Sequence, residues 1–171
     1  MIRPARPADA EDERAVERAA GARFGEIGMP HVAAHEPMSA DMLIGYALGG
    51  RSWVATDAVD RVVGYVIVDV VDGCAHIEQV SVRPADQGKG LGRALVARVE
   101  RWAADEGFSA VTLTTFKDVS WNRPLYEHLG FTVLGDAELT PELLQIREEE
   151  TRSGLDPATR VCMRKQVGPT R

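Results

Sequence analysis

The sequence has little of several features that mark specialised classes of protein. It contains two cysteines, Cys74 and Cys162, far apart and without motif spacing, so we expect reduced cysteines and no disulfide framework. No apolar run approaches the roughly 20 residues that cross a membrane. The N-terminal stretch MIRPARPADAEDE lacks an apolar segment after its basic residues, which argues against a signal peptide. These absences predict a cytoplasmic protein that does not associate with membranes.

The chain also lacks an excess of positive charge. Its formal net charge is −6 at pH 7, which argues against a nucleic-acid partner, because such partners usually need a basic face. The same charge is compatible with a cationic substrate such as an amine. The 171 residues are 44% hydrophobic and 27% charged, as in ordinary globular proteins, and contain no repeats. We expect one domain over residues 1–171.

Hydrophobic periodicity and turn residues predict an order of helices and strands. Asp9 is predicted to cap a helix that runs to about Phe24, with Val16, Ala20 and Phe24 as its buried stripe. The Gly- and Pro-containing stretch 25–37 is predicted to be a loop, long enough to suggest a binding role. Further helices are expected at 40–48, from the turn at 87–92 to Gly107, from Asn122 to Gly130, and at 140–152. Strands are expected at 2–5, 52–56, 61–71, 74–82, 110–116, 131–134 and 160–165.

The strand patterns favour a mixed sheet. Residues 61–71 are almost continuously apolar and β-branched, which is typical of a central strand buried on both faces. Asp72-Gly73 is a hairpin signal, so the strands on either side should be antiparallel. The strand–helix–strand unit from Cys74 to Phe116 requires a parallel pair. We therefore expect an α/β fold with about six to seven strands flanked by helices, in the order β-α-α-β-β-β-α-β-α-β with a C-terminal α-β extension.

The most informative stretch is the turn Gln87-Gly-Lys-Gly-Leu-Gly92, which follows a strand and opens a helix. Glycine permits positive φ and lets backbone N–H groups approach a ligand. At a helix N-terminus these groups and the helix dipole favour an anion, and Lys89 and Arg93 add positive charge. The turn therefore predicts a phosphate site, with a tight Gly-rich connection of no binding role as the alternative.

Two common phosphate motifs do not fit this turn. A Walker A loop needs Ser or Thr after its lysine, and Lys89 is followed by Gly90. A dinucleotide fingerprint needs glycine at its sixth position, where this chain has Arg93 or Leu95 depending on the starting glycine. The pattern that does fit is Gln87-x-x-Gly90-x-Gly92 after a strand ending in Val80-Ser-Val82.

On these residues the sequence resembles the GNAT superfamily of acetyl-CoA-dependent N-acetyltransferases, in particular bacterial members that act on small substrates. A second family landmark is similar to Leu125-Tyr-Glu-His-Leu-Gly-Phe131, and the order of elements matches over nearly the whole chain. The resemblance implies the GNAT fold, acetyl-CoA as cosubstrate, and a small-molecule or peptide amine as acceptor. Members commonly pair sheet edges, so it also allows a homodimer.

The resemblance implies which residues hold the donor. The β-strand backbone around Val80 and Val82 would pair with the pantetheine arm, and the amides of the turn, with Gln87, would hold the pyrophosphate. Asn122 lies only four residues before Tyr126, closer than the family's usual asparagine, so it is either a pantetheine contact or a helix cap. The implied cofactor-binding set is Val80, Ser81, Val82, Gln87, Gly88, Lys89, Gly90, Leu91, Gly92, Arg93 and Asn122.

The predicted catalytic residues are Glu78, His76 and Tyr126. By the resemblance Tyr126 lies near the sulfur and protonates the leaving thiolate, and a tyrosine hydroxyl suits that role; the alternative is a packing tyrosine. Glu78 and His76 share one strand face, since they are two residues apart. Glu78 is preferred as the base because partial burial can raise a carboxyl pKa, with His76 as the alternative because its free pKa already lies near neutrality. Either could instead be a solvated or locally bonded side chain.

The acceptor is not specified by the sequence. His35 and Glu36 are predicted substrate contacts because their loop covers the acceptor site in the resembling family. His31 and His35 have helical ligand spacing but no third ligand, so no metal is expected. The Glu148–Glu150 run is interpreted as a solvated helix end. The main alternatives to an N-acetyltransferase are a non-catalytic acyl-CoA-binding module and another type of nucleotide-phosphate binder.

Overall fold

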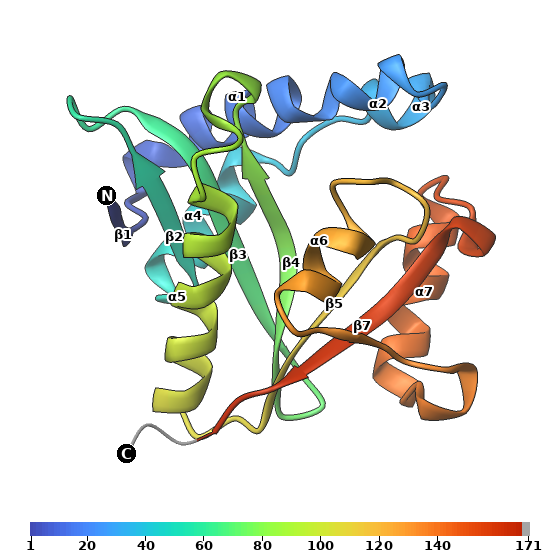
Figure 1. Cartoon of the computed structure of the whole chain (residues 1–171). Coiled ribbons are helices and arrows are strands. Elements are labelled where there is room, and N and C mark those ends of the chain that lie inside the picture. The colour runs from blue at the N-terminus through green and yellow to red at the C-terminus, as the bar shows by residue number, and fades with distance from the viewer. Residues whose placement is uncertain (169–171) are drawn as a thin grey trace. The chain divides into compact units, whose positions relative to one another are not determined.

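The computed structural model describes residues 1–168, which form seven strands and the helices between them (Figure 1). The strands follow the order β1-β2-β3-β4-β5-β7-β6, with a parallel β4–β5 pair and antiparallel pairs on both sides of it. This mixed α/β sheet confirms the predicted fold class. No helix in the described range is long and apolar enough to span a bilayer. The described chain divides into two compact units, residues 1–68 with 79–98, and residues 69–78 with 99–168.

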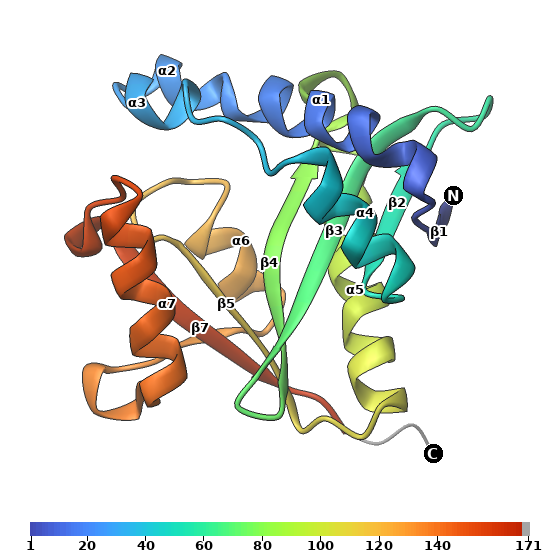
Figure 2. The ribbon, with the colours of Figure 1, turned by 180° about the vertical axis from the view of Figure 1, so that it is seen from behind.

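The first unit contains an antiparallel set of strands with helices on both faces. It is built from β1 (Ile2–Pro4), β2 (Ser52–Thr56), most of β3 (Val62–Val71) and the end of β4 (Cys74–Val82). Helices α1 (Ala10–Gly21) and α4 (Ala40–Leu48) lie on one face, and the first part of α5 (Leu91–Asp105) lies on the other (Figures 1 and 2). The core under α1 and α4 contains Ala5, Ala10, Val16, Leu43, Val54, Val62, Tyr65 and Ile67.

A glycine in β3 sets how closely β4 and α5 approach. A Cβ added at Gly64 would lie 3.0 Å from the carbonyl oxygen of Ser81 and 3.2 Å from the side chain of Val82. It would also lie 3.4 Å from the side chain of Leu95 in α5. These distances are tighter than nine in ten real Cβ contacts, so a side chain here would force its neighbours apart, and glycine lets β3, the end of β4 and the start of α5 pack closely.

The second unit contains the remaining strands and the C-terminal helix. β5 (Ala110–Phe116) pairs along its whole length with antiparallel β7 (Arg160–Gln166), which also pairs with the short β6 (Thr132–Val133). The last strand in the sequence therefore lies between β5 and β6. Two helices occur between these strands, α6 (Arg123–His128) and α7 (Pro141–Arg152). Asp72 and Gly73 have φ of 54° and 67°, as a two-residue hairpin requires, which confirms the predicted turn between β3 and β4.

The predicted N-terminal helix is wrong in its end and its cap. α1 ends at Gly21, and two short helices, α2 (Arg23–Glu26) and α3 (Pro30–Ala33), follow where a continuous helix and then a loop were expected. Ala20 and Phe24 are only half-buried, unlike Val16, because the helix breaks between them. Asp9 does not cap α1. Its carboxylate accepts the backbone N–H of Arg6 at 2.7 Å and pairs with Arg3 at 2.8 Å, so it closes the preceding 3₁₀ turn instead.

Candidate active site

The Gly-rich turn follows β4 and a 3₁₀ turn, Pro84–Asp86, and leads directly into α5. Gly88 and Gly90 have φ of 79° and 78°, a left-handed conformation that other residues rarely adopt. A Cβ added at either glycine would meet no atom within 4 Å. The glycines are therefore needed for the backbone conformation, and open space lies beside them.

This backbone leaves a row of N–H groups without protein acceptors. The first backbone hydrogen bond of the helix runs from Ala94 N–H to Gly90 O at 3.0 Å. In the described part of the chain, the N–H groups of residues 88–93 donate to no protein atom. Unpaired amides at a helix N-terminus, together with the helix dipole, form a site for an anion such as phosphate. The residues present therefore fit the predicted pyrophosphate site.

The sequence predicted that Lys89 and Arg93 both add positive charge at the turn, but only one of them is without an ion-pair partner among the described residues. Asp86 pairs with Arg83 at 2.6 Å and with Lys89 at 3.1 Å, and these two cations hold the pKa of the Asp86 carboxyl below its usual range. The charge of Lys89 is therefore partly compensated. Arg93 is exposed and has no ion-pair partner in residues 1–168. A cation that the sequence reasoning missed, Arg23, donates to Gln87 Oε1 at 2.6 Å.

The recorded pairing of β4 with β5 covers only part of β4. The register between β4 and β5 runs from Ala75 to Ile77, and no β5 partner is recorded in the described chain for Val80 or Val82. The Ser81 side chain is buried and accepts a hydrogen bond from Gln79 Nε2 at 2.8 Å, so it is used internally. Unpaired strand backbone can bind an extended ligand in the manner of an added strand.

The two predicted bases occupy different environments in β4. His76 is 1% exposed, its Nδ1 lies 2.8 Å from Thr112 Oγ1, and burial lowers its pKa. It is therefore a neutral, enclosed side chain at pH 7. Glu78 is exposed, but desolvation by the surrounding protein, followed by the negative charges of Asp69, Glu150 and Glu149, raises its pKa to about 7. Of the two groups, only Glu78 combines solvent access with a pKa suited to a base.

Glu150 of α7 is one of the carboxylates near Glu78. Its hydrogen bonds were not expected, because the sequence predicted a solvated helix end here. Its Oε2 accepts hydrogen bonds from Thr114 Oγ1 at 2.8 Å and from Arg160 Nη2 at 2.6 Å. Arg160 also lies over the ring of Phe116 at 4.5 Å from its centroid. Glu150 Oε1 and Arg160 Nε are buried without a partner. One arginine thus opposes the carboxylates around Glu78, so the local charge is negative.

Tyr126 is a buried side chain in α6. It is 8% exposed and packs edge-on against Phe131, with ring centroids 5.8 Å apart. Burial raises the pKa of its hydroxyl to about 12. The phenol hydroxyl therefore stays protonated at neutral pH. Toward a negatively charged neighbour it acts as a hydrogen-bond donor.

Asn122 precedes α6 but does not cap it with its side chain. Its Oδ1 accepts a hydrogen bond from Thr115 Oγ1 at 2.7 Å, while its Nδ2 is buried without an acceptor. A buried amide donor without a partner costs stability unless a ligand or water supplies one. Of the two roles predicted for Asn122, the side-chain cap is wrong, and the unpaired Nδ2 fits a contact to an amide-containing ligand.

The predicted substrate contacts, His35 and Glu36, are both exposed and follow α3. Glu36 pairs with Arg18 of α1 at 3.7 Å. Within residues 1–168, no group of three or more His, Cys, Asp or Glu residues is arranged to hold a metal ion. Cys74 and Cys162 are buried and unpaired.

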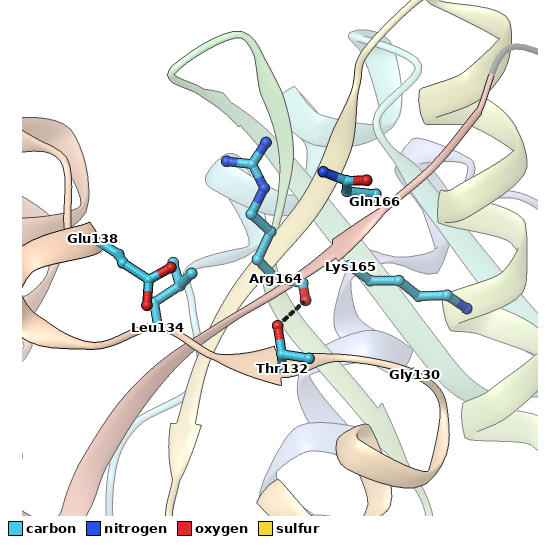
Figure 3. Close-up of a pocket in the computed structure, with 7 residues that line it drawn as sticks. All are labelled: Gly130, Thr132, Leu134, Glu138, Arg164, Lys165 and Gln166. Atoms are coloured by element: carbon cyan, nitrogen blue, oxygen red, sulfur yellow. Dashed lines mark hydrogen bonds between the residues drawn. The ribbon is translucent and has the colours of Figure 1, made fainter.

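A separate pocket of about 510 Å³ contains none of the predicted site residues (Figure 3); its lining residues are Gly130, Thr132, Leu134, Glu138, Arg164, Lys165 and Gln166.

The structure is a mixed α/β fold in which α5 begins at a row of unpaired amides that fit an anion. A model of the acetyltransferase (GNAT) family matches residues 23–131, which include both the turn and Tyr126. This chain therefore belongs to the GNAT family of acetyltransferases, as its sequence resemblance predicted.

Named relatives agree with this assignment. Mycothiol acetyltransferase from Kocuria rhizophila is 36% identical over 97 residues, which cover 48% of this chain and 32% of the relative. The chain thus spans about a third of the length of that curated relative. Ribosomal-protein-S18-alanine N-acetyltransferase from Escherichia coli is similar in structure (TM-score 0.66, 18% identity, 100% of this chain and 96% of that chain). So is PaiA N-acetyltransferase from Thermoplasma acidophilum, solved with coenzyme A (TM-score 0.70, 15% identity, 98% of each chain). These two structures share the fold.

Proposed function

We propose that this protein transfers an acetyl group from acetyl-CoA to a primary amine of a small molecule or peptide, by direct attack in a ternary complex. The observation that carries the proposal is the set of unpaired N–H groups at residues 88–93, which fit a pyrophosphate. The solved PaiA relative was crystallised with coenzyme A, which supports the same donor here. We further propose that residues 1–171 act as one acetyltransferase domain.

Acetyl-CoA would supply a thioester and a thiolate leaving group. The amides of residues 88–93 bind its pyrophosphate, with the positive charge of Arg93 beside them. The backbone of β4 at Val80 and Val82 pairs with the pantetheine arm, and Asn122 Nδ2 donates to one of its carbonyl groups. The amides of residues 88–93 and Asn122 Nδ2 can make these contacts without losing existing partners, since none of them has an acceptor in the described structure.

Glu78 acts as the base in this proposal. An amine attacks only when neutral, so its ammonium form must first lose a proton. A carboxylate with a pKa of about 7 is a much better base at neutral pH than an ordinary glutamate. The neighbouring carboxylates of Asp69, Glu149 and Glu150 favour the approach of a cation, which supports an amine acceptor. A backbone N–H near Val80 stabilises the oxyanion that forms on attack.

Tyr126 donates a hydrogen bond to the departing sulfur, which takes up the second proton of the attacking nitrogen and leaves as the thiol of coenzyme A. A free thiol has a pKa of about 8.5, so the hydroxyl, at about 12, is the weaker acid of the pair. The contribution of Tyr126 is therefore a strong hydrogen bond to the developing thiolate rather than complete proton release. His76 stays neutral and holds Thr112 of the neighbouring strand.

A thiol-release assay with acetyl-CoA and a panel of amines tests this function. We expect thiol to appear only when a suitable primary amine is present, and the product to be acetylated on nitrogen by mass spectrometry. Coenzyme A should also raise the unfolding temperature, because a ligand that binds only the folded state stabilises it. Stabilisation by coenzyme A, without thiol release from acetyl-CoA in the presence of any amine, would instead indicate an acyl-CoA-binding module.

Replacing Tyr126 with phenylalanine should lower kcat by about 100-fold, as for loss of one hydrogen bond to a charged group. The affinity for acetyl-CoA should change by less than about 2-fold, because the ring and its packing against Phe131 are kept. Steady-state kinetics and calorimetric titration with coenzyme A measure the two effects. Tyr46→Phe, the same chemical change in α4, is the control. An unchanged kcat in Tyr126→Phe would remove Tyr126 from the reaction.

A further inference from the structure

Arg23 connects α2 to the end of β4 through one glutamine. Its Nη1 donates to Gln87 Oε1 at 2.6 Å, across 64 residues of sequence. The same glutamine donates from Nε2 to the carbonyl oxygen of Val82 at 3.0 Å. The chain of contacts therefore runs from α2, through the side chain of a motif residue, to the backbone of the strand that precedes the turn.

The two contacts fix the orientation of the Gln87 amide. An arginine can only donate and a carbonyl can only accept, so reversing the amide would place donor against donor on one side and acceptor against acceptor on the other. The bond from Arg23 is also charge-assisted, which makes it stronger than a bond between neutral groups. Gln87 is therefore held in one position, and this fixes the distance between Val82 and the turn.

The segment that begins with Arg23 is held at its other end as well. Arg14 of α1 donates from Nε to the carbonyl oxygen of Met38 at 3.0 Å, and Arg18 pairs with Glu36 at 3.7 Å. The pairing between Arg18 and Glu36 is exposed and contributes little. The link from Arg23 to Gln87 joins the start of this segment to the donor turn.

We propose that Arg23 is a positioning residue for the pyrophosphate of the acyl donor and that it acts through Gln87. This inference rests on the proposed function. With the glutamine amide fixed, the backbone from Val82 to Gly90 is held in the conformation that presents the unpaired N–H groups of residues 88–93. A site that is already ordered in the free protein binds its ligand more tightly, because less conformational entropy is lost on binding. Without Arg23 the glutamine can rotate, and the turn must be ordered by the ligand.

Titration with coenzyme A and with dephospho-coenzyme A tests this role. Both ligands contain the pyrophosphate, but only the first carries the 3′-phosphate. We expect Arg23→Met to weaken both by the same factor, roughly 10-fold, as for loss of one charge-assisted hydrogen bond. Arg23→Lys should recover most of the affinity, since a lysine can still donate to Gln87. Arg6→Met, which removes an exposed arginine 61% open to solvent, is the matched control and should leave both affinities unchanged.

A double-mutant cycle separates action through Gln87 from direct contact with the donor. If Arg23 acts through the glutamine, adding Arg23→Met to Gln87→Ala should cause no further loss. Additive losses, a loss confined to coenzyme A, or unchanged affinity in folded Arg23→Met would each overturn the inference while leaving the proposed function in place. Failure of the wild-type protein to bind either ligand would remove the proposed function, and the inference with it.

Discussion

Replacing Glu78 with glutamine should lower kcat/KM for the amine at pH 7.5 by about 10²- to 10⁴-fold, the usual contribution of a general base. Glutamine has nearly the same shape but cannot accept a proton at this pH. Donor binding should be almost unchanged, because the unpaired amides of residues 88–93 and the charge of Arg93 are unaffected. Steady-state kinetics with acetyl-CoA saturating, together with titration by coenzyme A, measure both effects.

The pH profile of the wild-type enzyme provides a second measurement of the same role. The pKa of Glu78 is about 7, so kcat/KM should rise with pH up to about 7 and then level until other groups titrate. In Glu78→Gln this acid limb should disappear from the residual activity. An acid limb near pH 7 that persists in the variant would assign the base to another group.

The stability of Glu78→Gln shows whether the loss of activity is due to misfolding. The folded-state pKa of Glu78 is raised above that of the unfolded chain, so the folded protein binds the proton more tightly. Wild-type stability should therefore fall as the pH rises from about 4.5 to about 7, and remain lower above it. Because glutamine cannot ionise, we expect Glu78→Gln to be at least as stable as wild type at pH 8, by urea unfolding, with the difference shrinking at pH 5. A variant less stable at pH 8 would indicate a structural role.

Local chemistry explains which parts of the fold the sequence could predict. Asp72-Gly73 and the glycines of the turn need positive φ, and these conformations are set by each residue and its immediate neighbours. The continuous apolar run of β3 likewise reports burial directly. The placement of β7 between β5 and β6 depends instead on pairing between distant strands, which no local pattern records. The break after Gly21 was missed because the apolar spacing continues to Phe24 although the helix does not.

In the candidate site, too, local features could be predicted from the sequence and contacts between distant residues could not. The motif identified the donor turn, because anion binding at a helix N-terminus needs only a short run of residues. The spacing Arg83-x-x-Asp86-x-x-Lys89 was a readable sign that Lys89 is partly neutralised, since charges three residues apart can meet in a turn. Arg23 and Glu150 had no such signal, because each acts on a residue far away in the sequence. The choice between Glu78 and His76 also needed the structure, since strand alternation places both on one face but does not show which one is enclosed.

The amide of Leu91 offers a direct test of the donor site, because proline can remove it with little harm to the helix. Leu91 is the first residue of α5, and proline is favoured at this position, where no N–H is needed for the helix. We expect Leu91→Pro to weaken coenzyme A binding by about 10- to 100-fold, as for loss of one hydrogen bond to a charged group. KM for the amine should change little. Calorimetric titration gives the first value and steady-state kinetics the second.

Leu91→Ala separates loss of the amide from loss of the half-buried side chain. It should bind coenzyme A within about 2-fold of wild type, because alanine keeps the N–H and favours the helix. The two variants should unfold at similar temperatures, since the N–H of Leu91 has no protein acceptor to lose. If Leu91→Pro binds coenzyme A as tightly as Leu91→Ala while both are folded, the first amide of α5 does not contact the donor. The pyrophosphate would then have to be held by the N–H groups of the turn before the helix.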